Sequence, residues 1–314
     1  MPKITLFDSG VGITGSGGFI GAHLAASLGR RSAAHSYDVD VCSAEELGIV
    51  GRRMPLHSLV HLAAAGTVIT EIAAVPRMFE VSVGGALNAL NAFQPRRVVY
   101  SSSCSVYGNA SPLGGAPTWE DAHPISIYGL SKVTTEKLFE QWARKTGSTA
   151  MILRLGNVVG SGCAGLIPYL VRHAARYPDG GVPAEMRGGG RICRDYVPVD
   201  YVVRTTQAAL EMKLKPGSCP IYNVGSGRTL SNGDIAAILK EWLIDQGYVL
   251  NVVFQPAPEA GEALFSGLQT ASAENAFGLK PPSPEEVREA VLDAARSCLS
   301  RISQGNSISR SVLV

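Results

Sequence analysis

A tyrosine and a lysine lie four positions apart in the segment Tyr128-Gly129-Leu130-Ser131-Lys132. On a helix this spacing places the two side chains on one face, one turn apart. An ammonium group beside a phenol favours the phenolate and lowers the phenol pKa from about 10 toward neutrality. A phenolate held there can take a proton from a sugar or alcohol hydroxyl while a hydride leaves the same carbon. Because this spacing also arises by chance, the chemistry further requires a dinucleotide, a hydroxyl partner and a substrate pocket.

A glycine-rich segment, residues 10–21, comes directly before an apolar stretch with helical character. Two registers overlap in it, G-x-G-x-x-G from Gly10 and G-x-x-G-x-x-G over Gly15, Gly18 and Gly21. We prefer the second, because Gly21 leads into the helix, where a small residue lets helix and strand pack closely. In either register the backbone N–H groups can face a pyrophosphate at the helix N-terminus. A flexible loop without a ligand is the alternative.

A dinucleotide site also uses an acidic side chain about 20 residues after the glycines, at the end of the second strand, to bind the ribose hydroxyls. Asp38 and Asp40 lie at this distance. We assign Asp38 to the ribose, and Asp40 with Val41 to the border of the adenine. Loop acids without a ligand are the alternative. Arg30 and Arg31 precede this segment and keep a 2′-phosphate, and therefore NADP, possible.

Two apolar strands end in small or polar residues. Residues 58–62 run into the alanines 63–65, which let the backbone approach a flat ligand, and we expect His61 to be buried. Residues 97–101 run into the segment Ser101-Ser102-Ser103-Cys104-Ser105. Ligands of open α/β sheets bind outside the carboxyl ends of strands, so hydroxyls there can bond to a reacting oxygen. A polar turn that caps the strand is the alternative.

The composition indicates a cytoplasmic protein with a large core. The 314 residues are 46% hydrophobic with a net charge of +2, which suggests neither a nucleic-acid nor a membrane partner. The six cysteines show no metal spacing and are expected to be reduced thiols. Alternating strands and helices predict an α/β fold, a Rossmann doubly wound parallel sheet. We expect a dinucleotide domain over 1–160, to which part of 195–225 returns, and a smaller α/β substrate domain over 161–314.

Seven segments together resemble the extended short-chain dehydrogenase/reductase superfamily, and within it the NAD-dependent epimerase/dehydratase family that acts on nucleotide sugars. They are Thr14–Gly21, His61–Ala64, Ser101–Gly108, Tyr128–Lys132, Arg154–Asn157, Arg194–Tyr196 and Tyr222–Gly227. The resemblance implies NAD as cofactor, with NADP not excluded, a nucleotide-sugar substrate, and a homodimer formed through paired helices.

The resemblance also implies roles for single residues. Tyr128 would be the general base, Lys132 would hold the nicotinamide ribose, and Ser103 would share a hydrogen bond with the reacting hydroxyl. The residues expected to bind the cofactor are Gly15, Gly18, Phe19, Ile20, Gly21, Asp38, Asp40, Val41, Leu62, Ala63, Ala64, Ser101, Tyr128 and Lys132. The residues expected to bind the substrate are Ser103, Ser105, Tyr128, Asn157 and Arg194. A guanidinium suits this role because its planar fork binds phosphate oxygens bidentately.

Three positions depart from the family pattern. In 4,6-dehydratases of the family the catalytic serine or threonine is followed by Asp-Glu, whereas Cys104 and Ser105 follow it here, which argues against a dehydratase. Ser82 stands where many relatives have an asparagine that supports the lysine. The turn 259–262 lacks the arginine that many relatives use as a second phosphate ligand.

These features favour a nucleotide-sugar epimerase that acts at C4 of a UDP-hexose through a transient 4-keto intermediate. The alternative is an NAD(P)H-dependent reductase of 4-keto-6-deoxy nucleotide sugars, in which the same side chains serve a hydride that is delivered once. A dinucleotide-binding sensor without catalysis is a third hypothesis, which the intact set Ser103, Tyr128 and Lys132 disfavours.

Overall fold

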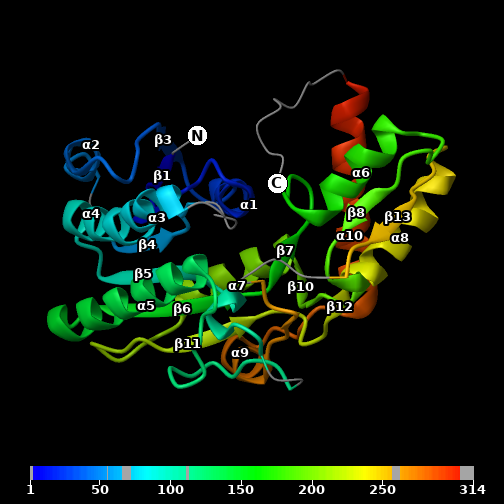
Figure 1. The fold of residues 1–314 in the computed structure, drawn as a ribbon. Helices are drawn as coiled ribbons and strands as arrows, with labels where there is room; N and C mark the ends of the chain where they lie inside the picture. The colour runs from blue at the N-terminus through cyan, green and yellow to red at the C-terminus, as the bar shows by residue number, and fades with distance from the viewer. Residues whose placement is uncertain (1–2, 55, 66–71, 111–112, 257–261, 305–314) are drawn as a thin grey trace.

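The computed structural model describes residues 3–54, 56–65, 72–110, 113–256 and 262–304. A seven-stranded sheet forms the larger part of the molecule (Figure 1). From edge to edge its strands are β11 (Ile221–Val224), β6 (Thr149–Leu155), β5 (Arg97–Ser103), β4 (Ser58–His61), β2 (Val11–Thr14), β1 (Ile4–Phe7) and β3 (Ala34–Tyr37).

Five of these strands, from β11 to β2, run parallel to one another. Their residues are nearly all buried, which is typical of strands that are covered on both faces. β1 forms a hairpin with β2 and pairs antiparallel with β2 and β3. The predicted doubly wound α/β fold is therefore confirmed, but β1 is an antiparallel strand within a sheet that we expected to be entirely parallel.

Helices cover both faces of the sheet. On one face lie α1 (Phe19–Gly29) and α7 (Val199–Glu211), whose Leu24 and Val202 share a core with the sheet. The other face is covered by α2 (Ala44–Gly51), α4 (Gly85–Phe93) and α5 (Ile127–Thr146). The short α3 (Val75–Phe79) and a π-helical turn (Glu80–Gly84) lead into α4, and α9 (Ala271–Phe277) packs against β11.

A second group of helices and short strands lies beside the sheet (Figure 1) and has a hydrophobic core of its own. It is formed by α6 (Leu166–Arg176), α8 (Asn232–Asp245), α10 (Pro284–Ser303), β8 (Ala184–Met186) and β13 (Val252–Phe254). Ser231 and Ser283 begin α8 and α10 with capping boxes. The predicted division of the chain near residue 160 stays a prediction. Within the segment 195–225, which we expected to return to the first domain, α7 covers the large sheet and β11 is its edge strand.

Short strands connect the two parts. β7 (Asn157–Val159) pairs with β10 (Tyr196–Pro198), and β9 (Cys193–Arg194) lies between β12 (Leu230–Ser231) and β14 (Phe265–Ser266). They place residues 157 and 194 above the carboxyl ends of the large sheet. Over the described residues, no helix is long and apolar enough to cross a membrane.

Candidate active site

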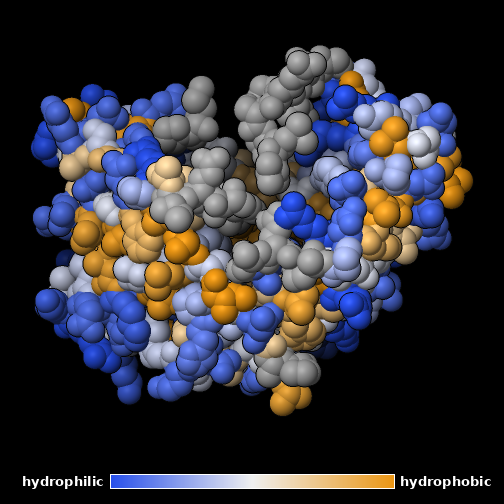
Figure 2. All heavy atoms as spheres, in the orientation of Figure 1, coloured by the Kyte–Doolittle hydropathy of each residue, from blue (hydrophilic) through white to orange (hydrophobic). Residues whose placement is uncertain are grey.

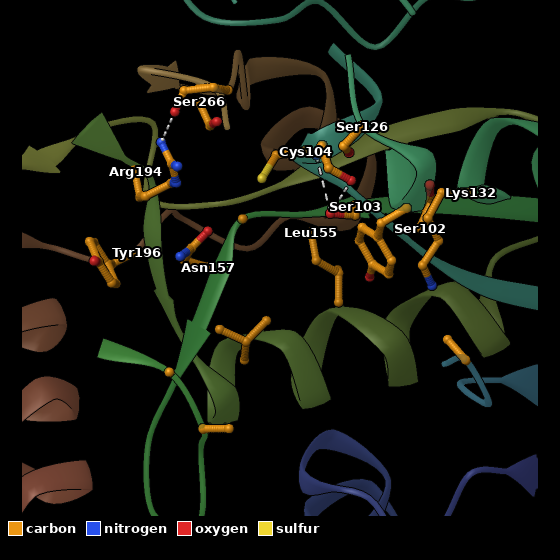
Figure 3. Close-up of a pocket in the computed structure, with 18 of the residues that line it drawn as sticks. Ser102, Ser103, Cys104, Ser126, Lys132, Leu155, Asn157, Arg194, Tyr196 and Ser266 are labelled. Carbon is orange, nitrogen blue, oxygen red and sulfur yellow. Dashed lines mark hydrogen bonds between the residues drawn. The ribbon is translucent and has the colours of Figure 1, made fainter. Parts of the chain in front are cut away.

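A cavity of about 1030 Å³ opens at the carboxyl ends of β4, β5 and β6. This is the edge at which open α/β sheets bind ligands. Strand ends and the start of α5 line one side, and the short strands of the smaller part line the other. In Figure 3, Ser103 and Lys132 lie on one side of the cavity, and Asn157, Arg194 and Tyr196 on the other.

The first turn of α5 brings Tyr128 to the strand end of β5. Ser126 caps the helix by accepting a hydrogen bond from the N–H of Gly129. A Cβ atom at Gly129 would lie 2.5 Å from the carbonyl oxygen of Ser105, so a larger residue would force the helix away from the strand end. Tyr128 and Ser103 are within hydrogen-bonding reach of each other.

Lys132 lies one turn further along α5 and is buried. Its Nζ donates a hydrogen bond of 2.9 Å to the carbonyl oxygen of Ser101 and lies 5.5 Å from the ring centre of Tyr128. Ser103 Oγ accepts hydrogen bonds from the N–H and the hydroxyl of Ser105 at 3.2 and 3.0 Å. The predicted tyrosine, lysine and serine are thus brought together at one strand end.

The pKa values of Tyr128 and Lys132 differ from the expectation. Burial raises the pKa of Tyr128 well above its ordinary value, with a further increase from Cys104, and the hydrogen bond with Ser103 offsets only part of it. Burial also lowers the pKa of Lys132 to about 8, against an opposing effect of Glu136. The predicted decrease of the Tyr128 pKa is therefore not found in this structure, because removal from water is the largest effect and only the hydrogen bond with Ser103 opposes it.

A fully buried ion pair fixes α5 to the sheet. The guanidinium of Arg154 on β6 donates to both carboxylate oxygens of Glu136 on α5, at 3.0 and 2.8 Å. Ser102 on β5 donates to the same carboxylate. Arg154 also donates to the carbonyl of Thr118 and lies 4.9 Å from the ring centre of Tyr107. These contacts join the helix of Tyr128 and Lys132 to the two strands beneath it.

The glycine segment between β2 and α1 fits a pyrophosphate. Gly15 has φ +73°, and a Cβ atom there would lie 2.8 Å from the backbone nitrogen of Ala63. A Cβ atom at Gly21 would collide with the backbone of residues 15–16. Gly18, the N-cap of α1, offers no side-chain cap, and no acid lies in the first turn. The N–H groups of Phe19 and Ile20 therefore remain for an anion.

Other predicted cofactor residues lie along the same edge. Ile20, Leu62, Ala64 and Ser101 line the cavity, and the N–H of Ala63 donates to Thr14 Oγ1 at 3.5 Å. His61 is fully buried, as expected. Its burial, together with the charge of Lys132, lowers its pKa to about 3.

The predicted acids and arginines lie elsewhere. Asp38 is exposed and follows β3, which β1 separates from the glycine segment. Asp40 pairs with Arg77 at 2.8 Å and accepts from the N–H of Cys42, which lowers its pKa. Val41 is buried against the start of α4.

Arg30 and Arg31 lie at the opposite end of β3 from the ligand edge. Arg30 is the C-cap of α1, and Arg31 lies 3.9 Å from Glu211 at the end of α7. Both precede Ala34, where β3 begins, whereas the ligand edge is at Tyr37. The expectation that these arginines could select a 2′-phosphate is therefore wrong.

Arg194 reaches the cavity from β9. Its guanidinium donates to Glu262 at 3.2 Å and to the carbonyl of Ala263 at 2.6 Å. The next residue, Asp195, is fully buried and accepts from both N–H groups of Ser226 and Gly227 and from the Ser226 hydroxyl. The carbonyl of Asp195 accepts from the N–H of Asn157 at 2.7 Å. Asp195 thereby holds both predicted substrate residues against the ends of β6 and β11.

Sequence reasoning missed several residues that line the cavity. Arg187, Ser266 and the segment 164–167 are among them. Arg187 precedes three consecutive glycines, a signal that could have marked a ligand loop, whereas Ser266 has no such signal. The turn 259–262 departs from the family pattern because it lacks an arginine. Its Glu262 pairs with Arg194, and residues 259–261 lie outside the described residues.

The comparisons with known proteins agree with this geometry. The NAD dependent epimerase/dehydratase family matches residues 11–225, more than half of the chain. The chain belongs to this family. The superfamily resemblance seen in the sequence is therefore confirmed, and the match to the family begins at β2, so that β1 lies outside it.

Within the family, several relatives are similar over most of their length. A GDP-6-deoxy-D-mannose reductase from Pseudomonas aeruginosa is 27% identical over 246 residues, which cover 73% of this chain and 78% of that protein. A UDP-glucose 4-epimerase from Azospirillum brasilense is 27% identical over 267 residues, with coverages of 73% and 76%. The crystal structure of a UDP-glucose 4-epimerase with UDP-glucose from Thermotoga maritima has a TM-score of 0.79 at 25% identity, and the match covers 93% of this chain and 99% of that one.

Proposed function

We propose that this member of the epimerase/dehydratase family is a nucleotide-sugar epimerase acting at C4 of a UDP-hexose through a transient 4-keto intermediate. The observation that carries the proposal is the meeting of Ser103, Tyr128 and Lys132 in one cavity, opposite Asn157 and Arg194. Similar relatives are named as UDP-sugar 4-epimerases, which supports the same reaction.

A nicotinamide dinucleotide, when bound, supplies the acceptor and donor of the hydride. The N–H groups of Phe19 and Ile20 at the first turn of α1 would hold its pyrophosphate, and Lys132 would hold its nicotinamide ribose. Tyr128 takes the proton of the C4 hydroxyl and returns it, while Ser103 holds that oxygen by a hydrogen bond. Lys132 places a positive charge 5.5 Å from the ring centre of Tyr128, which favours the phenolate against the opposing effect of burial. Asn157 and Arg194 hold the diphosphate of the substrate, so that Arg194 exchanges its contact with Glu262 for phosphate oxygens.

The residues beside Ser103 argue against the elimination of water. Cys104 and Ser105 occupy the places of the acidic pair, and burial raises the pKa of the Cys104 thiol to about 11, so it stays protonated. Among the described residues that line the cavity, Glu262 is the one carboxylate, and it pairs with Arg194. The chemistry is thus limited to moving a proton and a hydride at one carbon.

A second candidate is a reductase of 4-keto-6-deoxy nucleotide sugars. The same three side chains would serve it, and one similar relative is named as a GDP-6-deoxy-D-mannose reductase. The specific observation that favours it is that β1 separates β2 from β3, at the edge of the sheet where the adenosine of a dinucleotide would bind. A reductase must release its dinucleotide after each turnover, so tightly held, unexchanged NAD in the purified protein would argue against it.

The proposed enzyme is a homodimer through α4 and α5. Hydrophobic residues gather over these helices in Figure 2. Leu87 on α4 is 43% exposed, and Leu130 on α5 is 45% exposed. A contiguous apolar patch on the surface is typical of an interface. Leu87→Glu should shift the protein from dimer to monomer in sedimentation equilibrium, and an unchanged mass or a monomeric wild type would contradict the dimer.

The reaction is tested by incubating the purified protein with UDP-glucose or UDP-N-acetylglucosamine without added reductant. Proton nuclear magnetic resonance should show a C4 epimer that approaches equilibrium, and Tyr128→Phe should form none at the same protein concentration. Failure of every nucleotide hexose in the panel to give an epimer would reject the epimerase. Turnover of a 4-keto-6-deoxy sugar with a reduced dinucleotide would then support the reductase.

A further inference from the structure

β2 is the strand that leads into the glycine segment. The place next to it in the sheet, on the side of β3, is occupied by an unusual strand. In the usual doubly wound order, 3-2-1-4-5-6, the second strand runs parallel beside the first and ends in the acid that binds the ribose. Here β1 lies in that place, between β2 and β3. β1 comes before the glycine segment in the chain, runs antiparallel and lies outside the family match.

The pairing register shows how far the insertion of β1 moves Asp38 from the glycine segment. Ile4 of β1 lies opposite Thr14 of β2 and also opposite Tyr37 of β3. Asp38 is therefore level with Gly15 but two strand spacings away, about 10 Å instead of about 5 Å. Asp40, the other candidate, is held by Arg77. Neither Asp38 nor Asp40, which both follow β3, thus takes the usual place beside the glycine segment.

An antiparallel strand also presents its amino end at the ligand edge. Lys3 lies there, and its carbonyl oxygen accepts hydrogen bonds from the N–H groups of Gly15 and Ser16 at 2.9 and 3.1 Å. Alternation along an extended chain puts the side chains of Lys3 and Thr5 on one face. Thr5 Oγ1 donates to Ser16 Oγ at 2.9 Å, so this is the face toward the glycine segment.

We propose that β1 changes the cofactor specificity of the chain: Lys3 takes the place of the ribose acid and binds the 2′-phosphate of NADP or NADPH. The inference rests on the dinucleotide site of the proposed function. An acid at this place accepts hydrogen bonds from a free 2′-hydroxyl and repels a phosphate, whereas a lysine ammonium attracts the phosphate. Half-buried Lys3 joins the glycine segment by its backbone carbonyl, which anchors this residue at the end of β1 beside that segment rather than on a distant loop.

The test is the ratio of the dissociation constants for NAD⁺ and NADP⁺, measured by titration calorimetry on the full chain. We expect the wild type to bind NADP⁺ at least threefold more tightly than NAD⁺. Lys3→Gln should lower this preference about tenfold, and Asp38→Asn should leave the ratio within twofold. Lys213→Gln is the matched control, because this exposed lysine follows α7 at the other end of the sheet.

Several results would overturn the inference. One such result is a wild type that binds NAD⁺ tenfold more tightly than NADP⁺, together with an Asp38→Asn variant that lacks this preference. This result would show that Asp38 binds the ribose hydroxyls. An equal effect of Lys3→Gln and Lys213→Gln would remove the role of Lys3. Absence of binding by both dinucleotides would overturn the proposed function together with the inference, whereas the other two results leave the epimerase intact.

Discussion

The two ends of the proposed dinucleotide site are built from strands of different kinds. At the cavity end, β4, β5 and β6 run parallel, and Ser103, Tyr128 and Lys132 meet as expected from the sequence. At the adenosine end, an antiparallel strand separates the glycine segment from Asp38. The contrast suggests that the chemistry of a site and the choice of its cofactor can change independently, because they depend on different strands of one sheet.

The largest expected effect at the cavity end is the loss of activity in Tyr128→Phe. We expect kcat to fall by about 10²- to 10⁴-fold, the range that a positioned general base contributes. The midpoint of thermal unfolding should stay within about 2 °C, because the change removes one hydroxyl at the cavity and leaves the ring packed. A loss below tenfold in a steady-state assay would mean that another group takes the proton.

The scaffold under the cavity end is tested by Glu136→Gln. This substitution leaves the buried guanidinium of Arg154 without its partner charge, so unfolding free energy should fall by about 3–5 kcal/mol. Urea unfolding measures the loss. The double variant Glu136→Gln, Arg154→Met should recover part of it, because it removes the unpaired charge, and a double variant that is less stable than the single one would contradict this account.

Asp195, which joins the two parts of the molecule, gives a pH-dependent prediction. Burial raises its pKa to about 6 in the folded protein, above its ordinary value of 3.8. The folded state therefore binds this proton more tightly than the unfolded state. The stability that this group contributes is present below about pH 4 and is lost as the pH rises through 6.

The unfolding free energy of the wild type should accordingly fall relative to that of Asp195→Asn between pH 4 and pH 6. A shift of about two pKa units sets an upper limit of roughly 3 kcal/mol on this change. Chemical unfolding at several pH values, with both proteins in the same buffers, measures the difference. A difference that does not depend on pH, or that changes in the other direction, would show that hydrogen bonds from Ser226 and Gly227 outweigh burial.

The smallest expected effect is on substrate affinity. Arg194→Lys keeps the charge but loses the bidentate fork, so the KM for the nucleotide sugar should rise about tenfold at nearly unchanged kcat. Exposed Arg191 lies three residues away and does not line the cavity, and Arg191→Lys is the matched control. Equal KM values for the two variants would place the diphosphate elsewhere in the cavity.

The cavity end was predictable because its signals are local. The spacing of Tyr128 and Lys132 on one helix and the position of Ser103 at a strand end follow from periodicity and from the rule on strand ends. The adenosine end depends on strand order, and nothing in residues 3–7 tells that this segment enters the sheet between β2 and β3. The assignment of Asp38 assumed the usual order.

Other features depend on contacts between segments that are distant in sequence. The contacts between Arg154 and Glu136, and between Asp195 and Ser226, arise only when the chain is folded. The pKa of Tyr128 depends on its degree of burial, which spacing along a helix does not give. The fold class could be predicted from alternation alone, whereas these buried polar contacts could not.

The central claim is that one hydride leaves C4 and returns to the same carbon under the control of Tyr128 and Ser103. Its most direct test is incubation of the wild type with UDP-glucose that carries deuterium at C4, followed by mass spectrometry and nuclear magnetic resonance of the sugar. The account predicts a C4 epimer that keeps the deuterium at C4. Loss of deuterium to the solvent, or the absence of an epimer from every nucleotide hexose tried, would contradict it.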